Sequence, residues 1–295
     1  MTNLAEGRPL PAPGPSALRL VWGRLSGNTA VAIGGALFLL VVLVAVLAPM
    51  LAPADPTAIA PANRLKPPSA NYPFGTDAFG RDLLSRALHG ARISLAVGIG
   101  AAVTSVAAGL LIGLAAGYFR LVDALVMRVM DGLMAIPNIL LAIALVALSG
   151  ATLTTVLVAI TIPEIPRVVR LVRSIVLGVR EEPYVEAAIA SGTRLPLILW
   201  RHVAPNTVAP LIVQGTYVCA SAILTEAILS FLGAGISPET PTWGNIIAEG
   251  RIYFQLAPTI ILFPGLLLSV TVLSINMLGD GLRDTLDPKL VRRTG

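Results

Sequence analysis

Few side chains in this 295-residue sequence carry reactive chemistry, and their types already exclude several kinds of site. The single cysteine, Cys219, has no second cysteine with which to form an internal disulfide. One cysteine and two histidines, His89 and His202, are too few to build a metal cluster. The sequence also contains no Gly-x-x-x-x-Gly-Lys-Ser/Thr string to cradle phosphates. We therefore predict no catalytic site, no metal site and no nucleotide bound by this chain.

Charged residues inside apolar stretches are the second group of residues that could carry chemistry. Asp131, Glu164 and Glu226 lie within or beside such stretches, where a charge is costly unless it faces a partner or water. Arg128 stands three residues before Asp131, and Arg167 stands three residues after Glu164. This spacing places the members of each pair on one face of a helix. We interpret the two pairs as structural ion pairs, while Glu226 has no such local partner.

Long apolar helices must position these groups. Apolar residues make up 55% of the chain and charged residues 13%, against about 25% charged in an ordinary soluble domain. Five charge-free stretches exceed the roughly 20 residues that a helix needs to cross a bilayer, and one of them divides at Ser149-Gly150. The thinly spread net charge of +5 fits membrane topology better than nucleic-acid binding. We predict an all-α integral membrane protein with six transmembrane helices, at 29–50, 93–117, 122–148, 152–173, 206–232 and 256–281.

The distribution of basic residues predicts the orientation of these spans. Six spans place both ends on one side, and that side carries fifteen of the 21 lysines and arginines. The excess of basic residues marks the cytoplasmic side, so both termini are expected there. We divide the chain into a flexible cytoplasmic tail (1–28), a first span with its outer loop (29–92), a core of five spans (93–285) and a second cytoplasmic tail (286–295).

The cytoplasmic loop before the fifth span carries helix signals of its own. Glu181-Glu182-Pro183 is typical of a helix start, and Ser191-Gly192 of a helix end. Pro196 is expected to open a second short helix that Pro205 ends, with Asn206 capping the span that follows. Two short helices beneath the membrane fit either docking of another protein or an interfacial pair resting on lipid headgroups.

The first of these helices is lined with alanines, which let a partner surface approach closely. The run Glu186-Ala187-Ala188, followed by Gly192 and Pro205, resembles the EAA loop of ABC importer permeases. In that family the loop forms the coupling helix, which inserts into a cleft of the cytoplasmic ATPase. The usual ending Ile-x-Leu-Pro reads His-Val-Ala-Pro here, so two positions depart from it. The resemblance implies that residues 182–205 couple to the ATPase, chiefly through Tyr184, Glu186, Ala187, Ala188, Gly192 and Pro205.

Other segments resemble the dipeptide, oligopeptide and nickel branch of the same family. The run from Phe74 to Arg86 is similar to its outer-loop signature, and we expect a turn at 75–77 and an amphipathic helix over 80–90. In that helix the charged side chains are expected to face outward, and Thr242-Trp243-Gly244 is placed in the outer loop after the fifth span. The likeness covers about residues 29–290. It implies a type I (MetI-like) permease fold and the second of the two permease subunits.

Polar residues within the spans are candidates for the wall of a translocation path. Permeases of this type are similar in lining the path with their third and fifth helices. Hydrogen bonds between packed helices explain the same residues equally well. Glu226 either lines the path or pairs with the partner subunit, and Pro137 is expected to kink its helix. The path candidates are Asn138, Gln214, Thr216, Tyr217, Glu226 and Asn276.

The resemblance implies an ATP-driven importer that moves di- or oligopeptides by alternating access. Nickel chelates, glutathione and other small solutes remain alternatives. A secondary transporter driven by an ion gradient is less favoured, because Glu226 is the only unpaired acid in a span. The implied partners are a second homologous permease, two cytoplasmic subunits that bind ATP and Mg, an extracytoplasmic binding protein and membrane lipid, with no nucleic acid. The implied location is the bacterial cytoplasmic membrane.

Overall fold

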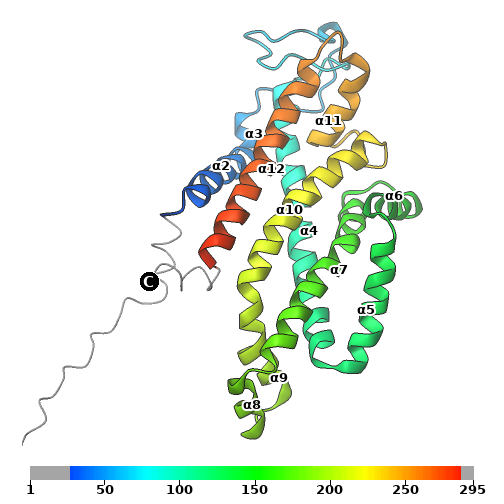
Figure 1. Ribbon diagram of the computed structural model, residues 1–295. Helices are drawn as coiled ribbons and strands as arrows, with labels where there is room; N and C mark the ends of the chain where they lie inside the picture. The colour runs from blue at the N-terminus through cyan, green and yellow to red at the C-terminus, as the bar shows by residue number, and fades with distance from the viewer. Residues whose placement is uncertain (1–26, 287–295) are drawn as a thin grey trace, which may run out of the picture.

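The computed structural model describes residues 27–286, and this part of the chain is built from helices joined by irregular segments, with no strand (Figure 1). The tails predicted at 1–28 and 286–295 fall almost entirely outside the described residues. The helices are α2 (Thr29–Val46), α3 (Ala48–Leu51), α4 (Leu83–Tyr118), α5 (Arg120–Ala135), α6 (Asn138–Ser149), α7 (Leu153–Val179), α8 (Pro183–Ala190), α9 (Leu195–Ile198), α10 (Val208–Phe231), α11 (Trp243–Gly250) and α12 (Thr259–Leu286), with short 3-10 or π turns η1 (Pro61–Asn63), η2 (Leu199–Val203), η3 (Ala204–Thr207) and η4 (Arg251–Tyr253).

Four helical segments are long and apolar enough to cross a membrane: α2, α4, α12 and the stretch Pro205–Phe231 that contains α10. The bent pair α5 and α6 adds a fifth if it counts as one span. The 27-residue helix α7 does not pass the same test, and it carries Glu164, Arg167, Arg170 and Arg173 along its length. The described residues therefore form a multi-span helical membrane protein in which α7 is the polar exception.

The second predicted span is longer than expected. The sequence predicted a separate amphipathic helix over 80–90 and a span over 93–117, but α4 runs without interruption for 36 residues. It begins at Leu83, where the Asp82 carboxylate accepts a hydrogen bond from the backbone N–H of Ser85. Gly90 does not break the helix. The backbone of Thr242 and Trp243 packs against it so closely that a Cβ would lie 3.3 Å away.

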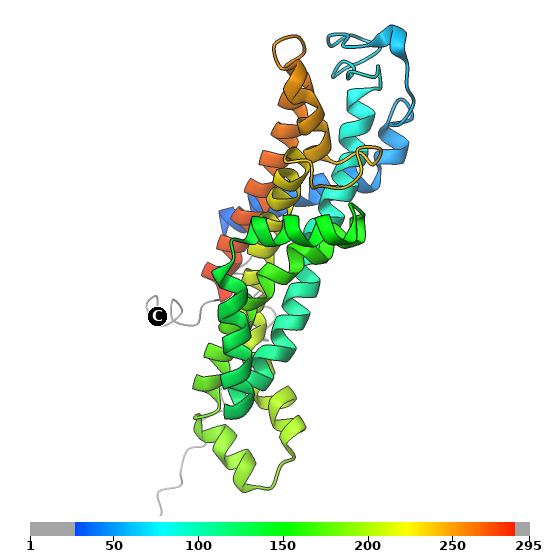
Figure 2. The ribbon, with the colours of Figure 1, turned by 90° about the vertical axis from the view of Figure 1, so that its right-hand side faces the viewer.

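The third predicted span, 122–148, is broken. Helices α5 and α6 meet at a bend of 90° at Ile136 and Pro137. Proline disfavours the helical region for the residue before it, and Ile136 accordingly adopts the extended values φ −92° and ψ 130°. Helix α6 therefore crosses the bundle sideways instead of continuing α5 (Figure 2).

Small residues allow α4 and α7 to approach closely. Three glycines spaced four residues apart on α4 face three valines spaced four residues apart on α7, and a Cβ added at any of the glycines would lie within 2.7 Å of a valine side chain. Packing of this kind holds helices together in lipid, where the hydrophobic effect does not. The facing positions are Gly109 with Val168, Gly113 with Val172 and Gly117 with Val176.

The two ends of the molecule differ in structure. The irregular segment between α3 and α4 lies with α11 at one end of the bundle, and α8 and α9 lie at the other (Figures 1 and 2). Near the middle, the start of α2 contacts the end of α12, because Asn28 Nδ2 donates to the carbonyl of Gly281 at 3.4 Å.

Candidate functional site

Residues 182–205 form a hairpin that projects from one end of the bundle, and we call it the α8–α9 hairpin (Figure 1). Helix α8 starts at Pro183 with Glu182 at its N-cap, and Ser191 ends it before Gly192, which takes φ +73°. These bounds match the signals in the sequence. Glycine is needed at this last position because other residues rarely adopt a positive φ.

The hairpin is anchored along one side and open along the other. Val185 is fully buried, whereas Glu186 and Ala187 are exposed and Tyr184 is 46% exposed. The amide of Asn206 donates to the Tyr184 hydroxyl at 3.3 Å and ties α8 to the approach of α10. The hairpin therefore presents an exposed face of α8 from a fixed base.

The second half of the hairpin differs from its prediction. Pro205 does not end a helix, and Asn206 does not cap α10, because its amide donates to the carbonyl of His202 at 2.7 Å. The π turn η2, in which Ala204 N–H bonds to Leu199 O, widens the helix ahead of Pro205. This wider turn relieves the usual clash between a proline ring and the carbonyl four residues earlier. Helical conformation therefore continues from α9 through η2 and η3 into α10.

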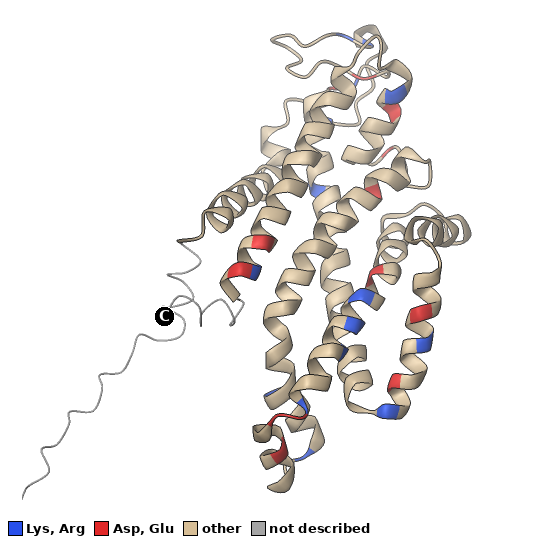
Figure 3. Ribbon diagram, in the orientation of Figure 1, with Lys and Arg blue, Asp and Glu red and all other residues tan. Residues whose placement is uncertain are grey.

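Charged residues gather on α5 and α7 (Figure 3). Arg167 Nη1 lies 3.4 Å from both carboxylate oxygens of Glu164, as the spacing of the two residues predicted. The pair predicted between Arg128 and Asp131 is wrong: Asp131 instead binds Nη2 of Arg170 at 2.6 Å. Helix α7 packs beside α5, so Arg170 reaches Asp131 across the contact between the two helices.

The polar candidates on α10 fall into two environments. Tyr217 is 51% exposed, and its ring centre lies 5.8 Å from the guanidinium carbon of Arg167. Gln214, three residues earlier, shares that face of the helix and is half-buried. Thr216 instead points at α12, where Gly279 leaves room for its side chain. Asn138 begins α6 at the bend, half-buried, and Asn276 is exposed on α12.

Glu226 is fully buried inside this chain, which contradicts both of its predicted roles. Its Oε1 atom accepts hydrogen bonds from the hydroxyls of Ser230, at 2.8 Å, and Thr242, at 2.9 Å. It is therefore exposed neither to a translocation path nor to a partner subunit. Its contacts instead join α10 to the N-terminus of α11, which Thr242 caps.

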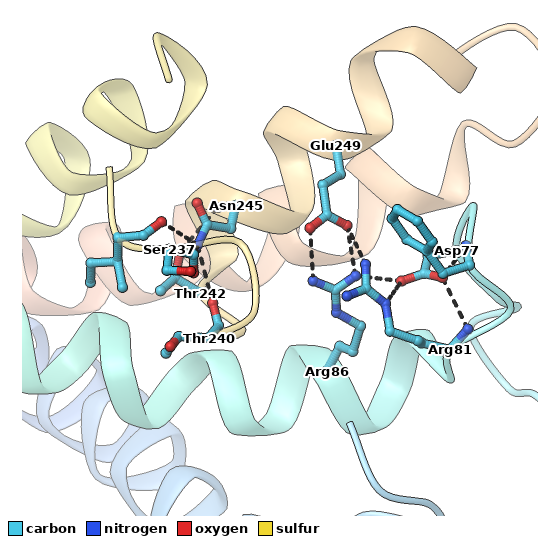
Figure 4. A network of polar contacts seen from close by, with 10 residues as sticks. Asp77, Arg81, Arg86, Ser237, Thr240, Thr242, Asn245 and Glu249 are labelled. Atoms are coloured by element: carbon cyan, nitrogen blue, oxygen red, sulfur yellow. Dashed lines mark hydrogen bonds and ion pairs between the residues drawn. The ribbon is translucent and has the colours of Figure 1, made fainter. Parts of the chain in front are cut away.

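A buried cluster of four charges lies where the segment between α3 and α4, predicted as an outer loop, meets α4 and α11, and we call it the outer charge cluster (Figure 4). The Asp77 carboxylate binds Arg81 at 2.6 Å and also Arg86, and both arginines bind Glu249 at 2.7 Å. The prediction that Arg81, Asp82 and Arg86 face outward is wrong, because all three are buried. Glu249, which follows 163 residues after Arg86, supplies the counter-charge that draws the arginines inward.

Helix α11 fixes the same region, and the sequence placed its first residues in a loop. The indole N–H of Trp243 donates to the carbonyl of Ala87 at 3.0 Å, and the ring is almost fully buried. The amide of Asn245 donates to three carbonyls of the preceding loop (Figure 4), those of Ile236, Ser237 and Thr240, at 3.0–3.2 Å. A threonine three residues before Asn245 was the available signal of a helix start.

The chain matches two family models. One, described as a binding-protein-dependent transport system inner membrane component, covers residues 106–292, and the other, described as the N-terminal TM domain of oligopeptide transport permease C, covers residues 16–68.

Curated relatives match over most of their length. A probable peptide ABC transporter permease of Sinorhizobium fredii is 55% identical over 263 residues, which are 89% of this chain and 90% of the relative. A di/tripeptide transport system permease of Pseudomonas aeruginosa is 44% identical over 284 residues, which are 94% of this chain and 93% of the relative. A glutathione transport system permease of Pectobacterium atrosepticum is 40% identical over 274 residues, which are 92% of this chain and 91% of the relative.

The helical bundle and these matches define the class of protein as a membrane permease subunit of an ABC transport system, which is a transport component and not itself an enzyme. The chain belongs to the family of binding-protein-dependent transport system inner membrane components, as the resemblance of its EAA-like segment indicated.

Proposed function

We propose that this chain is the second permease subunit of an ATP-driven importer of di- or oligopeptides. The names of the relatives at 55% and 44% identity support this substrate class. Glutathione is the second candidate, since a permease named for it is 40% identical, and nickel chelates follow from the resemblance alone. An ion-gradient transporter is disfavoured further, because Glu226, the acid it would need, is buried against Ser230 and Thr242.

The observation that carries the proposal is the exposed face of α8. Glu186 and Ala187 are exposed on a helix whose Val185 is fully buried, so this face has a fixed position and no residue within 27–286 covers it. We assign it to the ATPase subunits, with Tyr184, Glu186, Ala187, Ala188, Gly192 and Pro205 as the coupling residues. Transmission requires that this face bind differently to the two states of the ATPase.

The proposed topology has six spans, formed by α2, α4, the pair α5 and α6, α7, α10 and α12. Both termini and the α8–α9 hairpin lie in the cytoplasm, and the outer charge cluster lies outside. The excess of lysine and arginine on the hairpin side supports this orientation. So does the position of the hairpin and of α11 at opposite ends of the bundle (Figure 1). The proposed location is the bacterial cytoplasmic membrane.

The proposed assembly pairs this chain with a second, homologous permease, two ATP-binding subunits that hold ATP and Mg, and an extracytoplasmic binding protein. Closure of the ATPases moves the hairpin, and the helical run from α9 into α10 carries that movement into the bundle. The path then opens outward to receive substrate from the binding protein. Hydrolysis of ATP restores the inward-facing state.

Replacement of one exposed alanine on α8 tests the coupling role. Ala187→Trp adds bulk to the face that would enter the ATPase without disturbing a buried contact, so we expect the ATPase subunits to be lost on purification of the complex. The matched control is Ala58→Trp, another exposed alanine in the outer loop, which should leave co-purification intact. Retention of the ATPases and of normal uptake by the Ala187→Trp complex would refute the coupling role.

A further inference from the structure

A half-exposed arginine lies near the middle of α7, beside α10. The side chain of Arg167 is 38% exposed, although the helices on either side of it are candidate or proposed spans. A guanidinium exposed at this depth is costly in lipid and normally faces water or a partner. The exposed side of Arg167 therefore belongs to a polar space inside the assembly.

Arg167 retains unused hydrogen-bonding capacity. Guanidinium has five N–H donors, but within residues 27–286 only the Nη1 atom of Arg167 donates, to Glu164 at 3.4 Å. Arg173, two turns further along α7, binds the carboxylate of Asp123 through both Nε and Nη2. Arg167 is thus held in place by Glu164 while its Nε and Nη2 groups stay available.

Two side chains of α10 border the same space. The ring of Tyr217 lies 5.8 Å from the guanidinium carbon and is half-exposed, and Gln214 lies one turn earlier on the same face. Over the described part of the chain neither side chain hydrogen-bonds to another residue. Arg167 lies beside the phenol of Tyr217, and the amide of Gln214 follows one turn away on the same face of α10, so a cation, a phenol and an amide with free capacity lie along the contact between α7 and α10.

The summed charge of α5 and α7 favours an anion. Helices α5 and α7 carry five arginines and three carboxylates, an excess of two positive charges. Glu164 is buried, accepts from Ser221 as well as from Arg167 and offsets part of the charge of Arg167. The excess positive charge therefore comes from Arg120 and Arg128 on α5. The charged residues concerned are Arg120, Asp123, Arg128, Asp131, Glu164, Arg167, Arg170 and Arg173.

We propose that Arg167, with Gln214 and Tyr217, binds the C-terminal carboxylate of a peptide during its passage. The planar guanidinium matches a carboxylate with two parallel N–H groups, and the amide and phenol add further hydrogen bonds. Every linear peptide carries this carboxylate, so the site recognises peptides irrespective of their side chains. Glu164 is a positioning residue that orients the guanidinium. This assignment rests on the proposed function as a peptide importer.

The test uses the complete complex in proteoliposomes and two versions of one tripeptide, with a free carboxylate and with a C-terminal amide. Each peptide is supplied at saturation of the binding protein, so that the rates report translocation. Arg167→Gln should lower import of the carboxylate form about tenfold relative to the amide form, because charge-assisted hydrogen bonds are lost. Arg167→Lys keeps the charge and should recover part of the loss.

Arg170→Gln is the matched control, since Arg170 lies on the same helix but binds Asp131 at 2.6 Å. It should change import of both peptides by the same factor. An equal reduction in the import of both peptides by Arg167→Gln would overturn the assignment of this site and would show that Arg167 is purely structural. Failure of the wild-type complex to import either peptide would instead refute the proposed function itself.

A second measurement separates a peptide carboxylate from an acidic residue of the partner permease. A benzophenone amino acid introduced at position 217 should cross-link labelled tripeptide during ATP turnover. Cross-linking of the second permease without any capture of peptide would overturn the proposal.

Discussion

The outer charge cluster and the charged pairs of α5 and α7 show two ways of keeping charge inside one apolar chain. In the outer charge cluster, Arg86 and Asp77 are almost fully buried, and each of the four charges contacts two opposite charges. In the charged pairs of α5 and α7, Arg167 and Arg170 are each about two-fifths exposed, and each contacts one carboxylate. A closed cluster stabilises a loop, whereas open pairs leave groups available to a ligand or partner.

The largest expected effect comes from opening the outer charge cluster. Asp77→Ala leaves Arg81 and Arg86 to share Glu249 and should lower the free energy of unfolding by about 3–5 kcal/mol, the usual cost of breaking a buried pair. Thermal unfolding in detergent measures this loss, read from the reactivity of the buried thiol of Cys219. Glu239→Ala, at an exposed acid of the segment between α10 and α11, should change stability by under about 0.5 kcal/mol. Equal effects of the two substitutions would contradict a closed cluster.

A smaller loss of stability is expected where α4 packs on α7. Glycines and valines, not ion pairs, hold these two helices together. Gly113→Ala brings a Cβ within 2.6 Å of Val172 and should destabilise the protein by about 1–3 kcal/mol. Gly132→Ala, on α5, meets nothing within 4 Å and should stabilise it by about 0.5–1 kcal/mol. The same thiol assay compares them. Stabilisation by both substitutions would show that the glycines are not packing residues.

The smallest expected effect is on the exposed pair of α5 and α7. Arg170→Gln removes an ion pair whose side chains are 43% and 61% exposed, and pairs of this exposure contribute about 1 kcal/mol or less. We therefore expect a change in melting temperature of a few degrees at most, measured in the same detergent. A loss of stability as large as that caused by Asp77→Ala would contradict the difference proposed between the outer charge cluster and the charged pairs of α5 and α7.

Local signals in the sequence located the helices and turns well. Pro183 and Gly192 bound α8 as their backbone preferences require, and Pro137 produces the bend that separates α6 from α5. Each of these features depends on the φ and ψ values of one or two residues. Such preferences act within a turn of chain and can therefore be derived without the fold.

Contacts between distant residues were not predictable in the same way. Arg86 faces inward because Glu249 lies opposite it, and Asp131 binds Arg170 because α7 passes beside α5. Helical periodicity alone offered only partners three or four residues away. Glu226 was misassigned for a mixed reason: Ser230 was a partner within periodicity's reach that a search for charged partners passed over, and Thr242 follows 16 residues later beyond a turn. The tertiary arrangement therefore decides which partner each charged side chain binds.

The π turn at Leu199–Val203 has a mechanical consequence. Val203, Ala204 and Thr207 all keep helical φ and ψ values on either side of Pro205, so the chain has no extended joint between α9 and α10. A push on the base of the hairpin is therefore not absorbed by a flexible elbow. Under the proposed coupling, such a push acts directly on α10, the helix that carries Gln214 and Tyr217.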